Sequence, residues 1–517
     1  MMSLPRLLLF TLLSAMPFVA AGCAHIDARP DYDRAAELIT VATGEADVLA
    51  DDDDAARMAT CEAMLKDGLM LEEVVKLAML NSPAIRAEFL EIGVARADLV
   101  QSGLFSNPTF GLSVQFPEGG GRSNLQGNIA QNIVDLWQIP VKKEIASRNL
   151  EGAILRVADA AVRLAAQARS AFFITVGARQ ARAIAEENVS LAQRLMEVAE
   201  ARKQAGAVGD LDVNLARGGL LAARIEVQRA SLAAALAEAD LAQILGLRTN
   251  LDTVDLSTPL PLPPETALDT DAIIQLAVDS RLDLKAAAMN VDAAERQIVL
   301  EIRKIIPSFQ IGLAVERNER RALQGRNLFA DTTRATIKNG TLSPPDFQTR
   351  GQRNQERSAE IDAIFGPSLS VTLPIFDQNQ AQIARARFAY EQEMRRWEAL
   401  EVSAMQSIRR AVVSAQTSWD IARSFARDVL PQAARNLEMS RESYKVGRSS
   451  LIIVLDAQRV LLEARSGYVA ALQTAAVNVA DLEQASARPI SEILRHGIAQ
   501  VTTTQSSDER PQAADER

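Results

Sequence analysis

Few residues of this 517-residue chain are of the types that usually carry out chemistry. It contains two histidines, His25 and His496, and two cysteines, Cys23 and Cys61. Two histidines are too few for a histidine-rich metal site, and they leave a histidine-based catalytic triad almost nothing to work with. The sequence also lacks the glycine-rich phosphate loop that ends in Lys-Ser/Thr, and it lacks a His-Glu-x-x-His motif. We therefore expect that the chain is not an enzyme and holds neither a metal nor a cofactor.

Cys23 is the residue for which the sequence predicts a reaction. It follows Arg6 and an apolar run, the pattern of a secretory signal peptide over residues 1–22. The segment Ala20-Ala21-Gly22-Cys23 resembles the lipobox of bacterial lipoproteins, in which the cysteine thiol is acylated and becomes the first mature residue. The resemblance implies lipid attachment at Cys23, and Ala24 in place of an aspartate implies sorting to the outer membrane. An ordinary signal peptide followed by a nearby cysteine is the alternative.

Composition limits the class of protein and identifies the polar ends. The formal charge is −10 and no basic stripe is interleaved with aromatic residues, so a nucleic-acid partner is disfavoured. The apolar fraction is 48% and aromatic residues make up only 4%, which suits long, closely packed helices rich in alanine and leucine. We expect residues 23–68 to form an N-terminal tether that contains the acidic run Asp51–Asp54 as a solvated linker. Residues 491–517 are expected to be a disordered polar tail.

Between these ends the sequence repeats itself. Its landmarks are Ala78 and Pro108 in the first copy, and Ala277 and Pro307 in the second, both pairs at an offset of 199 (277 − 78 and 307 − 108). Further on, Gly206 and Gly447 begin matching segments at an offset of 241 (447 − 206). The duplication predicts two similar repeats, residues 69–260 and 261–490, within one intertwined architecture.

Each repeat is expected to contain a long helical hairpin. A seven-residue rhythm of small and branched apolar residues begins at Leu150, and the sequence predicts a helix over residues 142–204. Such a helix would be about 90 Å long at 1.5 Å per residue. The second repeat predicts a helix over residues 378–444 with a kink near Pro431. Gly206 and Gly447 then supply the hairpin turns, where a left-handed conformation suits glycine.

Four segments alternate apolar and polar residues as strands do. They are Thr109–Phe116, Leu125–Asp135, Ser308–Glu316 and Ser368–Ile375. A half-buried sheet of a soluble protein has the same period of two. The small uncharged residues of the polar face and the secretion signal favour strands of an outer-membrane barrel, with apolar residues outside. Four strands cannot close such a barrel, so the chain must then oligomerise, with eight strands from two copies or twelve from three.

The order and spacing of these features in both halves resemble the TolC-like outer membrane efflux protein family over about residues 70–490. Two strand-exit segments add to the resemblance, Ile133-Val-Asp-Leu-Trp137 and Pro374-Ile-Phe-Asp377. The resemblance implies a mainly α-helical fold with a membrane β-barrel. Each repeat would supply a strand hairpin and a long helix hairpin, and a homotrimer would form a twelve-stranded barrel continued by an α-helical barrel. It also implies location in the outer membrane of a Gram-negative bacterium, with the chain reaching into the periplasm.

The implied function is that of the outer-membrane exit channel of a tripartite efflux pump. Such a channel is a passive conduit that is gated at its periplasmic helix tips, and its partners are outer-membrane lipid, a periplasmic adaptor protein and an inner-membrane pump. Two alternatives remain open on the sequence. One is the outer-membrane channel of a type I protein secretion system, and the other is a periplasmic coiled-coil scaffold lipoprotein without a pore.

The resemblance further implies gate residues at the hairpin tips. In the family, an aspartate after the first tip glycine forms a hydrogen bond with a tyrosine before the second, and Asp212 and Tyr444 occupy these positions. Arg448 lies one position before the place of the family's gate arginine, and Ser449 occupies the matching position.

Two aspartates after the second tip glycine can form rings that constrict the family's entrance. Asp456 matches one of them, and Ile453 stands at the other, so one ring would be charged and the other apolar. Helix capping or ordinary surface charge is the alternative for Asp212 and Asp456, and simple packing is the alternative for Tyr444.

Overall fold

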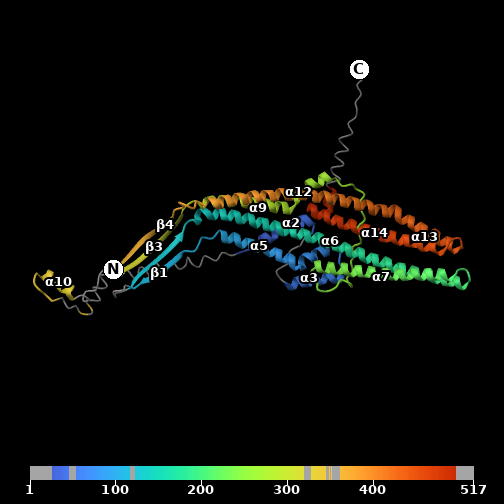
Figure 1. The fold of residues 1–517 in the computed structure, drawn as a ribbon, viewed down its shortest axis with the longest axis horizontal. Helices are drawn as coiled ribbons and strands as arrows, with labels where there is room; N and C mark the ends of the chain where they lie inside the picture. The colour runs from blue at the N-terminus through green and yellow to red at the C-terminus, as the bar shows by residue number, and fades with distance from the viewer. Residues whose placement is uncertain are drawn as a thin grey trace, which may run out of the picture. The chain divides into compact units, whose positions relative to one another are not determined.

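The computed structural model describes residues 26–45, 54–116, 123–319, 328–344, 349, 351 and 361–495 (Figure 1). Its helices are α2 (Arg29–Thr43), α3 (Asp54–Asp67), α4 (Leu71–Asn81), α5 (Pro83–Ser102), α6 (Asp135–Gln204), α7 (Asp210–Ile244), α8 (Thr270–Ser280), α9 (Leu282–Arg303), α10 (Leu328–Asn339), α12 (Gln380–Ser424), α13 (Leu430–Lys445) and α14 (Leu451–Ser486). Its strands are β1 (Thr109–Gln115), β2 (Asn124–Asn132), β3 (Ser308–Glu319) and β4 (Ile361–Thr372).

The chain divides into two compact units, each of which combines segments from both repeats. The helical unit is the described part of residues 1–97, 148–291 and 392–517, and the sheet unit is the described part of residues 98–147 and 292–391. Cys23, the signal peptide and residues 496–517 lie outside the described residues.

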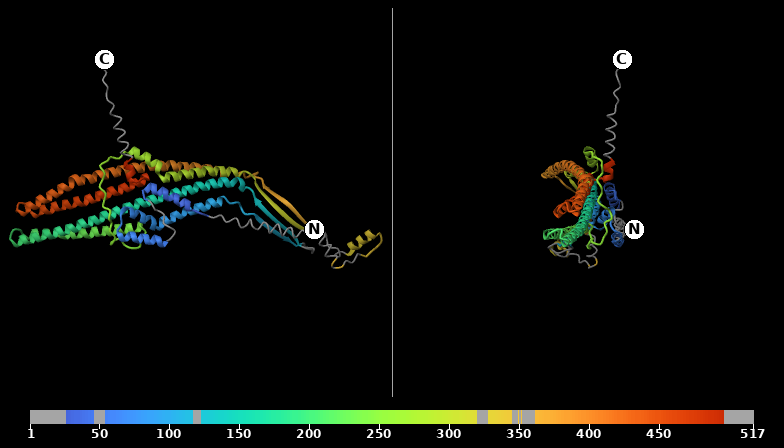
Figure 2. Two further views of the ribbon diagram at one scale, coloured as in Figure 1. Left: turned by 180° about the vertical axis from the view of Figure 1, so that it is seen from behind. Right: turned by 90° about the vertical axis from the view of Figure 1, so that its right-hand side faces the viewer.

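The helical unit contains two long hairpins, α6 with α7 and α13 with α14 (Figure 1, Figure 2). α6 begins seven residues before the predicted helix (142 − 135) and carries Pro140 inside its first turns. The second predicted helix is divided by a π-helical turn, Phe425–Val429, where the Leu430 N–H bonds to the Phe425 carbonyl. The turn ends two residues before Pro431, which has no N–H to donate, so the break lies near the predicted kink. None of the helices in the described ranges combines the length and hydropathy that crossing a membrane requires.

Alanine and glycine let the long helices approach one another closely. The fully buried Trp419 and Phe172 belong to separate apolar clusters of the helical unit, in which most other members are small or branched. Gly467 on α14 faces the ring of Phe425, and a Cβ placed there would lie 2.8 Å from two of the ring carbons. A side chain at position 467 would therefore force the π-helical turn away from α14.

The structure differs from the sequence prediction at both ends of the helical unit. The segment predicted to be a tether contains α2 and α3, and Ile39 of α2 is fully buried against α6 residues such as Leu155. Residues 490–495, at the start of the predicted polar tail, are helical, and Ile493 is buried. The apolar residues of these short segments are too few to show a clear period, and only packing against the long helices reveals their role.

The sheet unit contains one antiparallel sheet with the order β1-β2-β3-β4, in which β2 and β3 join the two repeats. β2 ends at Asn132 because Asp135 already begins α6. β4 begins seven residues before the predicted strand (368 − 361) and ends at Thr372. Gly366 and Pro367 resemble a turn in the sequence, but β4 pairs only with β3 within the described residues, and proline is tolerated in such an edge strand.

The register of the four strands places apolar residues on one face of the sheet. Phe110, Ile129 and Leu313 pair across three strands and are 70%, 53% and 52% exposed. The neighbouring row on the opposite face consists of Gly111, Asn128, Ala314 and Gly366. The sheet therefore presents a continuous exposed apolar face and a face of small or polar residues, and an apolar face of this kind marks an interaction surface.

Candidate functional site

The two hairpin tips turn in the same way. Gly206 and Gly447 adopt the left-handed conformation with φ of 70° and 77°. At the first tip the Ala207 N–H donates to the Arg202 carbonyl at 2.8 Å, and at the second the Arg448 N–H donates to the Ser443 carbonyl at 2.8 Å. These bonds from residue i to residue i−5 close both long helices with the same glycine-dependent motif. The repeat is thus preserved in the backbone of the tips.

The side chains that follow the two turns are different. The first turn of α7 carries Asp210 and Asp212, whereas the first turn of α14 has no acidic residue and holds Ile453 at the position equivalent to Asp212. Asp210 forms an ion pair with Lys203 across the turn. Its hydrogen bond to the Lys203 ammonium keeps the pKa of Asp210 below its usual value. The first turn of α7 is therefore acidic, and the first turn of α14 is apolar.

Tyr444 does not make the hydrogen bond to Asp212 that the resemblance implies. Its side chain is 5% exposed and packs in an apolar cluster drawn from both hairpins. The hydroxyl oxygen is buried and has no hydrogen-bond partner among the described residues. Because the ring is held between the hairpins, the tyrosine contributes packing to the tip instead of a polar link to α7.

Arg202, which the sequence analysis did not single out, joins the two hairpins. Its guanidinium carbon lies 4.3 Å from the centroid of the Tyr444 ring, and its Nη1 donates to the Tyr444 carbonyl oxygen at 2.9 Å. Cation–π contact and a charge-assisted hydrogen bond therefore act on the same residue. A basic residue in the last turn of a helix is common, so the sequence signal alone does not predict this partner.

A groove of about 370 Å³ lies along α13 and α14 close to the second tip. It is lined by Asn436, Met439, Ser440, Ser443, Ser449, Ile453, Asp456, Ala457 and Val460. Ile453 is 50% exposed, and the exposed Asp456 forms an ion pair with Arg459 at 2.9 Å. The structure thus brings Ile453 and Asp456 to one groove, while Arg448 is exposed at the turn and does not line it.

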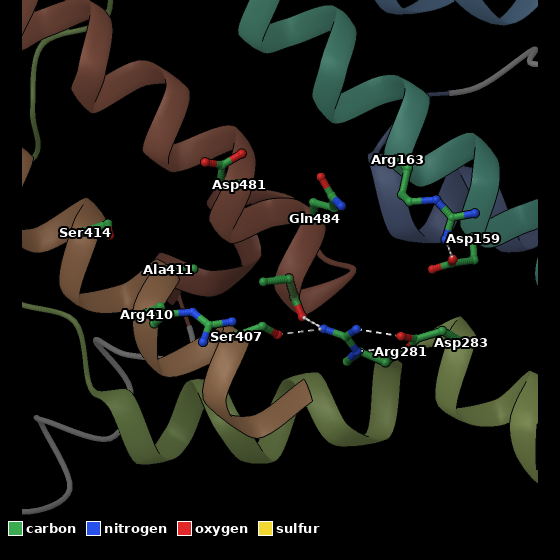
Figure 3. A pocket seen from close by; sticks show the side chains of 11 residues that line it. Asp159, Arg163, Arg281, Asp283, Ser407, Arg410, Ala411, Ser414, Asp481 and Gln484 are labelled. Carbon is green, nitrogen blue, oxygen red and sulfur yellow. Dashed lines mark hydrogen bonds and ion pairs between the residues drawn. The ribbon is translucent and has the colours of Figure 1, made fainter. Parts of the chain in front are cut away.

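A pocket of about 490 Å³ lies among α6, α9, α12 and α14 of the helical unit (Figure 3). Arg281 donates to the Asp283 carboxylate at 3.0 Å, to Ser407 Oγ at 3.3 Å and to the Ala485 carbonyl at 3.0 Å. Burial raises the pKa of Asp159 above its usual value, although its ion pair with Arg163 acts in the opposite direction. Arg281 is thus already used to hold α8 and α9 to α12 and α14. Within the described ranges, no group of three or more His, Cys, Asp or Glu residues could hold a metal ion.

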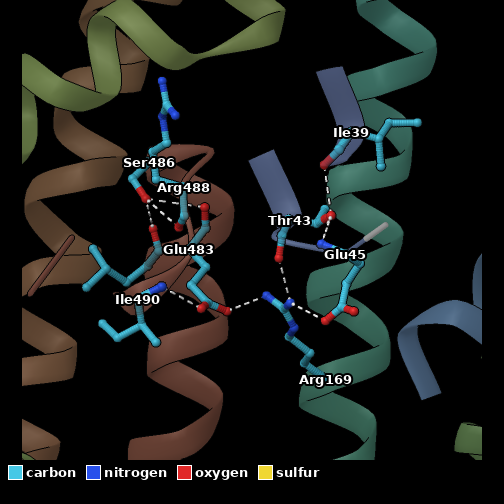
Figure 4. Close-up of polar contacts among 9 residues, drawn as sticks. Ile39, Thr43, Glu45, Arg169, Glu483, Ser486, Arg488 and Ile490 are labelled. Carbon is cyan, nitrogen blue, oxygen red and sulfur yellow. Dashed lines mark hydrogen bonds and ion pairs between the residues drawn. The ribbon is translucent and has the colours of Figure 1, made fainter. Parts of the chain in front are cut away.

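A second polar centre surrounds Arg169 of α6 (Figure 4). Its guanidinium donates to Glu483 at 2.7 Å and to the Thr43 carbonyl at 2.9 Å, and it lies 3.4 Å from Glu45. Glu483 also accepts the Ile490 N–H at 2.7 Å. Burial raises the pKa of Glu45 above its usual value, and Arg169 opposes that shift. One cation therefore ties the end of α2, the middle of α6 and the end of α14.

In the sheet unit, polar side chains join the segments that precede β1 and β3 to the residues that follow β2 and β4. The Asp135 carboxylate accepts the Ser106 N–H at 2.8 Å and the Ser106 hydroxyl at 2.7 Å. Asn379, with φ of 60°, donates its amide to the Glu301 carbonyl at 2.8 Å and to the Glu301 carboxylate at 2.7 Å. Desolvation raises the pKa of both carboxyls, but these bonds and nearby lysines outweigh it and hold both pKa values below the usual range. Each pair of bonds thus links the segment before one strand hairpin to the start of the helix after it.

Comparison with known proteins shows what this chain is similar to. Residues 273–488 match the family described as outer membrane efflux protein. Protein CyaE of Bordetella pertussis is 28% identical over 362 residues, which cover 64% of this chain and 72% of that protein. The cobalt-zinc-cadmium resistance protein CzcC of Cupriavidus metallidurans is 22% identical over 413 residues, which cover 78% and 86% of the two chains.

Solved structures share the fold at low sequence identity. The outer membrane channel CmeC of Campylobacter jejuni superposes with a TM-score of 0.63 at 17% identity, covering 83% of this chain and 89% of that one. The outer membrane protein VceC of Vibrio cholerae superposes with a TM-score of 0.61 at 15% identity, covering 81% and 96% of the two chains.

Proposed function

From the membership of this chain in the outer membrane efflux protein family, we infer that it is the exit channel of an efflux pump in the outer membrane of a Gram-negative bacterium. The observation that carries the proposal is the four-stranded sheet, whose exposed apolar face is continuous across paired strands. A face of this kind opposite small and polar residues suits strands with lipid on one side and water on the other. The chain is a passive conduit, and transport energy comes from its partners.

The open edges of the sheet support assembly of three copies. In the described part of the chain, β1 and β4 each pair on one side only. An unpaired edge in lipid leaves backbone groups without partners, so the edges of neighbouring copies must pair. Three copies give twelve strands and a lumen, whereas eight strands would be filled by side chains.

An apolar stripe on α7 supports the same assembly. Leu221, Ile225, Leu232 and Leu236 are 53%, 51%, 61% and 58% exposed at spacings of four and seven residues along the helix. Such spacing makes a seam that suits a second helix. A helix of a neighbouring copy of this chain packs against this seam, and the helices of three copies form the wall of a periplasmic tunnel. A periplasmic adaptor and an inner-membrane pump complete the assembly.

Asp456 and Ile453 constrict this tunnel near its tips. Replacing Asp456 by asparagine is expected to reduce the preference of the pore for cations, because three carboxylates around a narrow entrance attract cations. The measurement is the reversal potential of the purified full-length protein in a planar lipid bilayer under a salt gradient.

Asp420→Asn is the matched control for the selectivity experiment, because Asp420 also forms an ion pair with an arginine three residues later and is similarly exposed. The control should keep the wild-type reversal potential. A wild-type chain that conducts no current would contradict the channel itself and favour a scaffold without a pore. Equal ion selectivity of Asp456→Asn and Asp420→Asn would show that Asp456 does not line the constriction.

Lipid attachment at Cys23 is a separate proposal that rests on the lipobox. Replacing Cys23 by serine is expected to abolish incorporation of radiolabelled palmitate, because serine lacks the thiol that accepts the first lipid. Cys61 is buried, and burial raises the pKa of its thiol, so Cys61→Ser should leave the label unchanged. Label that persists in the Cys23 variant would refute the assignment.

A further inference from the structure

We propose that Arg202 is the clamp that holds the two helical hairpins together at the closed end of the channel. The proposal rests on the proposed function, since it names the residue that restrains the gate. It concerns a contact between residues that are 242 positions apart, one in each repeat.

The backbone of Arg202 is fixed by the first tip. Its carbonyl accepts the Ala207 N–H at 2.8 Å, which is one of the bonds that close the turn at Gly206. Its side chain therefore leaves the last turn of α6 from a constrained position. The guanidinium cannot move away from the second hairpin without a rotamer change or a change in the tip itself.

The acceptor of this guanidinium lies at the C-terminal end of α13. The Tyr444 carbonyl is among the last carbonyls of that helix, which have no partner inside the helix. Nη1 of Arg202 lies 2.9 Å from it, and the Gly447 N–H bonds to the same oxygen at 3.0 Å. The negative end of the α13 dipole favours a cation at this place, so one hairpin caps the helix of the other.

The ring of Tyr444 makes the contact sensitive to sliding of the hairpins. It packs with Ala199 and Val213 of the first hairpin and with Leu437 of the second, under the Arg202 guanidinium. A shift of one hairpin past the other would withdraw the ring from this cluster and break the hydrogen bond at the same time. Among the described residues Arg202 has no carboxylate partner, so its charge is committed to Tyr444.

The same interface contains groups that favour its opening. The Tyr444 hydroxyl and the Gln458 side-chain oxygen are buried without hydrogen-bond partners in the part of the chain that the structure describes, and both lie on the second hairpin. Opening would let water reach these atoms, which partly offsets the contacts that are lost. The Arg202 contacts favour the closed interface and the two unsatisfied polar groups favour the open one. This balance suits an interface that must both close and open.

The clamp is tested with the full-length protein by two independent readouts, bilayer conductance and amide hydrogen exchange over residues 440–450. Arg202→Ala should shift the ratio of open to closed channels about tenfold toward open, as loss of a charge-assisted hydrogen bond predicts, and should speed exchange in that segment. Arg202→Lys should fall between the alanine variant and wild type, since it keeps the charge without the planar guanidinium. Arg194→Ala, an exposed arginine two turns earlier on α6, is the matched control and should behave as wild type.

Tyr444→Phe separates the clamp from a latch through the tyrosine hydroxyl. The clamp predicts no increase in conductance or exchange, because the ring and the backbone carbonyl remain and only an unpaired hydroxyl is lost. The proposal would be overturned if Tyr444→Phe opened the channel and if Arg202→Ala had the same conductance and exchange as Arg194→Ala. If the wild-type chain does not conduct and Arg202→Ala still speeds exchange, the channel proposal is wrong and the clamp proposal stands.

Discussion

Replacing Arg169 by leucine is expected to lower the free energy of unfolding by about 3–5 kcal/mol, the loss found when one partner is removed from a buried ion pair. The side chains of Arg169 and Glu483 are each only 11% exposed, and that of Glu45 is 21% exposed. Without the guanidinium, two carboxylates would face each other in a site from which water is largely excluded. The measurement is denaturant unfolding followed by far-ultraviolet circular dichroism.

The free energy of unfolding that is lost on replacing Arg169 should become smaller as the pH falls. Burial already raises the folded-state pKa of Glu45, and loss of the arginine, which opposes that shift, raises it further above the value in the unfolded chain. The folded protein then binds more protons than the unfolded chain between the two pKa values, so stability recovers as the pH falls through this window. A loss of stability that becomes larger as the pH is lowered would contradict the explanation by buried charge.

Two further variants give the Arg169 experiment its controls. Arg182 on the same helix lies 3.6 Å from Glu186 in an exposed i,i+4 pair, so Arg182→Ala should cost less than about 1 kcal/mol. Arg169→Leu combined with Glu483→Gln should recover part of the loss, because one of the stranded charges is removed. Equal stability of the Arg169 and Arg182 variants would show that this centre does not hold α2 and α14 to α6.

Replacing Leu313 by arginine is expected to lower the amount of folded trimer in the outer membrane. Leu313 lies on the exposed apolar face of β3 and pairs with Ile129 and Pro367. An arginine on the lipid side of a barrel near the membrane midplane costs about 2–4 kcal/mol in each copy. The measurement is the amount of folded trimer in the outer membrane, detected by its altered migration in unheated samples.

The neighbouring residue Ala314 provides a matched control, because successive residues of a strand point to opposite faces. Ala314 pairs with Asn128 and Gly366 on the face of small and polar residues. Ala314→Arg should therefore assemble, and it should narrow the pore and lower its conductance. Assembly of Leu313→Arg together with loss of Ala314→Arg would mean that the two faces are assigned the wrong way round.

Features that depend on neighbouring residues could be predicted from the sequence. Strict alternation located the four strands, and glycine marked the two turns, because a left-handed conformation is costly for residues with a Cβ. The bounds of the fourth strand were predicted wrongly. The fourth strand was predicted to begin at Ser368, yet β4 begins at Ile361 and includes Gly366 and Pro367, because the edge of the sheet tolerates proline.

The candidate site was predicted less completely. The sequence located the tips and placed Ile453 and Asp456 near each other, since three residues of a helix bring side chains to one face. It implied a hydrogen bond between Asp212 and Tyr444 that the structure does not contain. It also passed over Arg202 and Arg169, whose significance lies entirely in partners far away in the chain.

By itself, the sequence determined the duplicated plan, the alternating strands and the two glycine turns, because each follows from the conformations open to a short run of residues. Only the tertiary structure decided that Arg202 caps α13 and that Arg169 meets Glu483, across 242 and 314 residues. These partners depend on how two hairpins and a short helix pack, and no local pattern specifies that packing. The two repeats are alike because their backbones obey the same local rules, and they work differently because packing gives their side chains different partners.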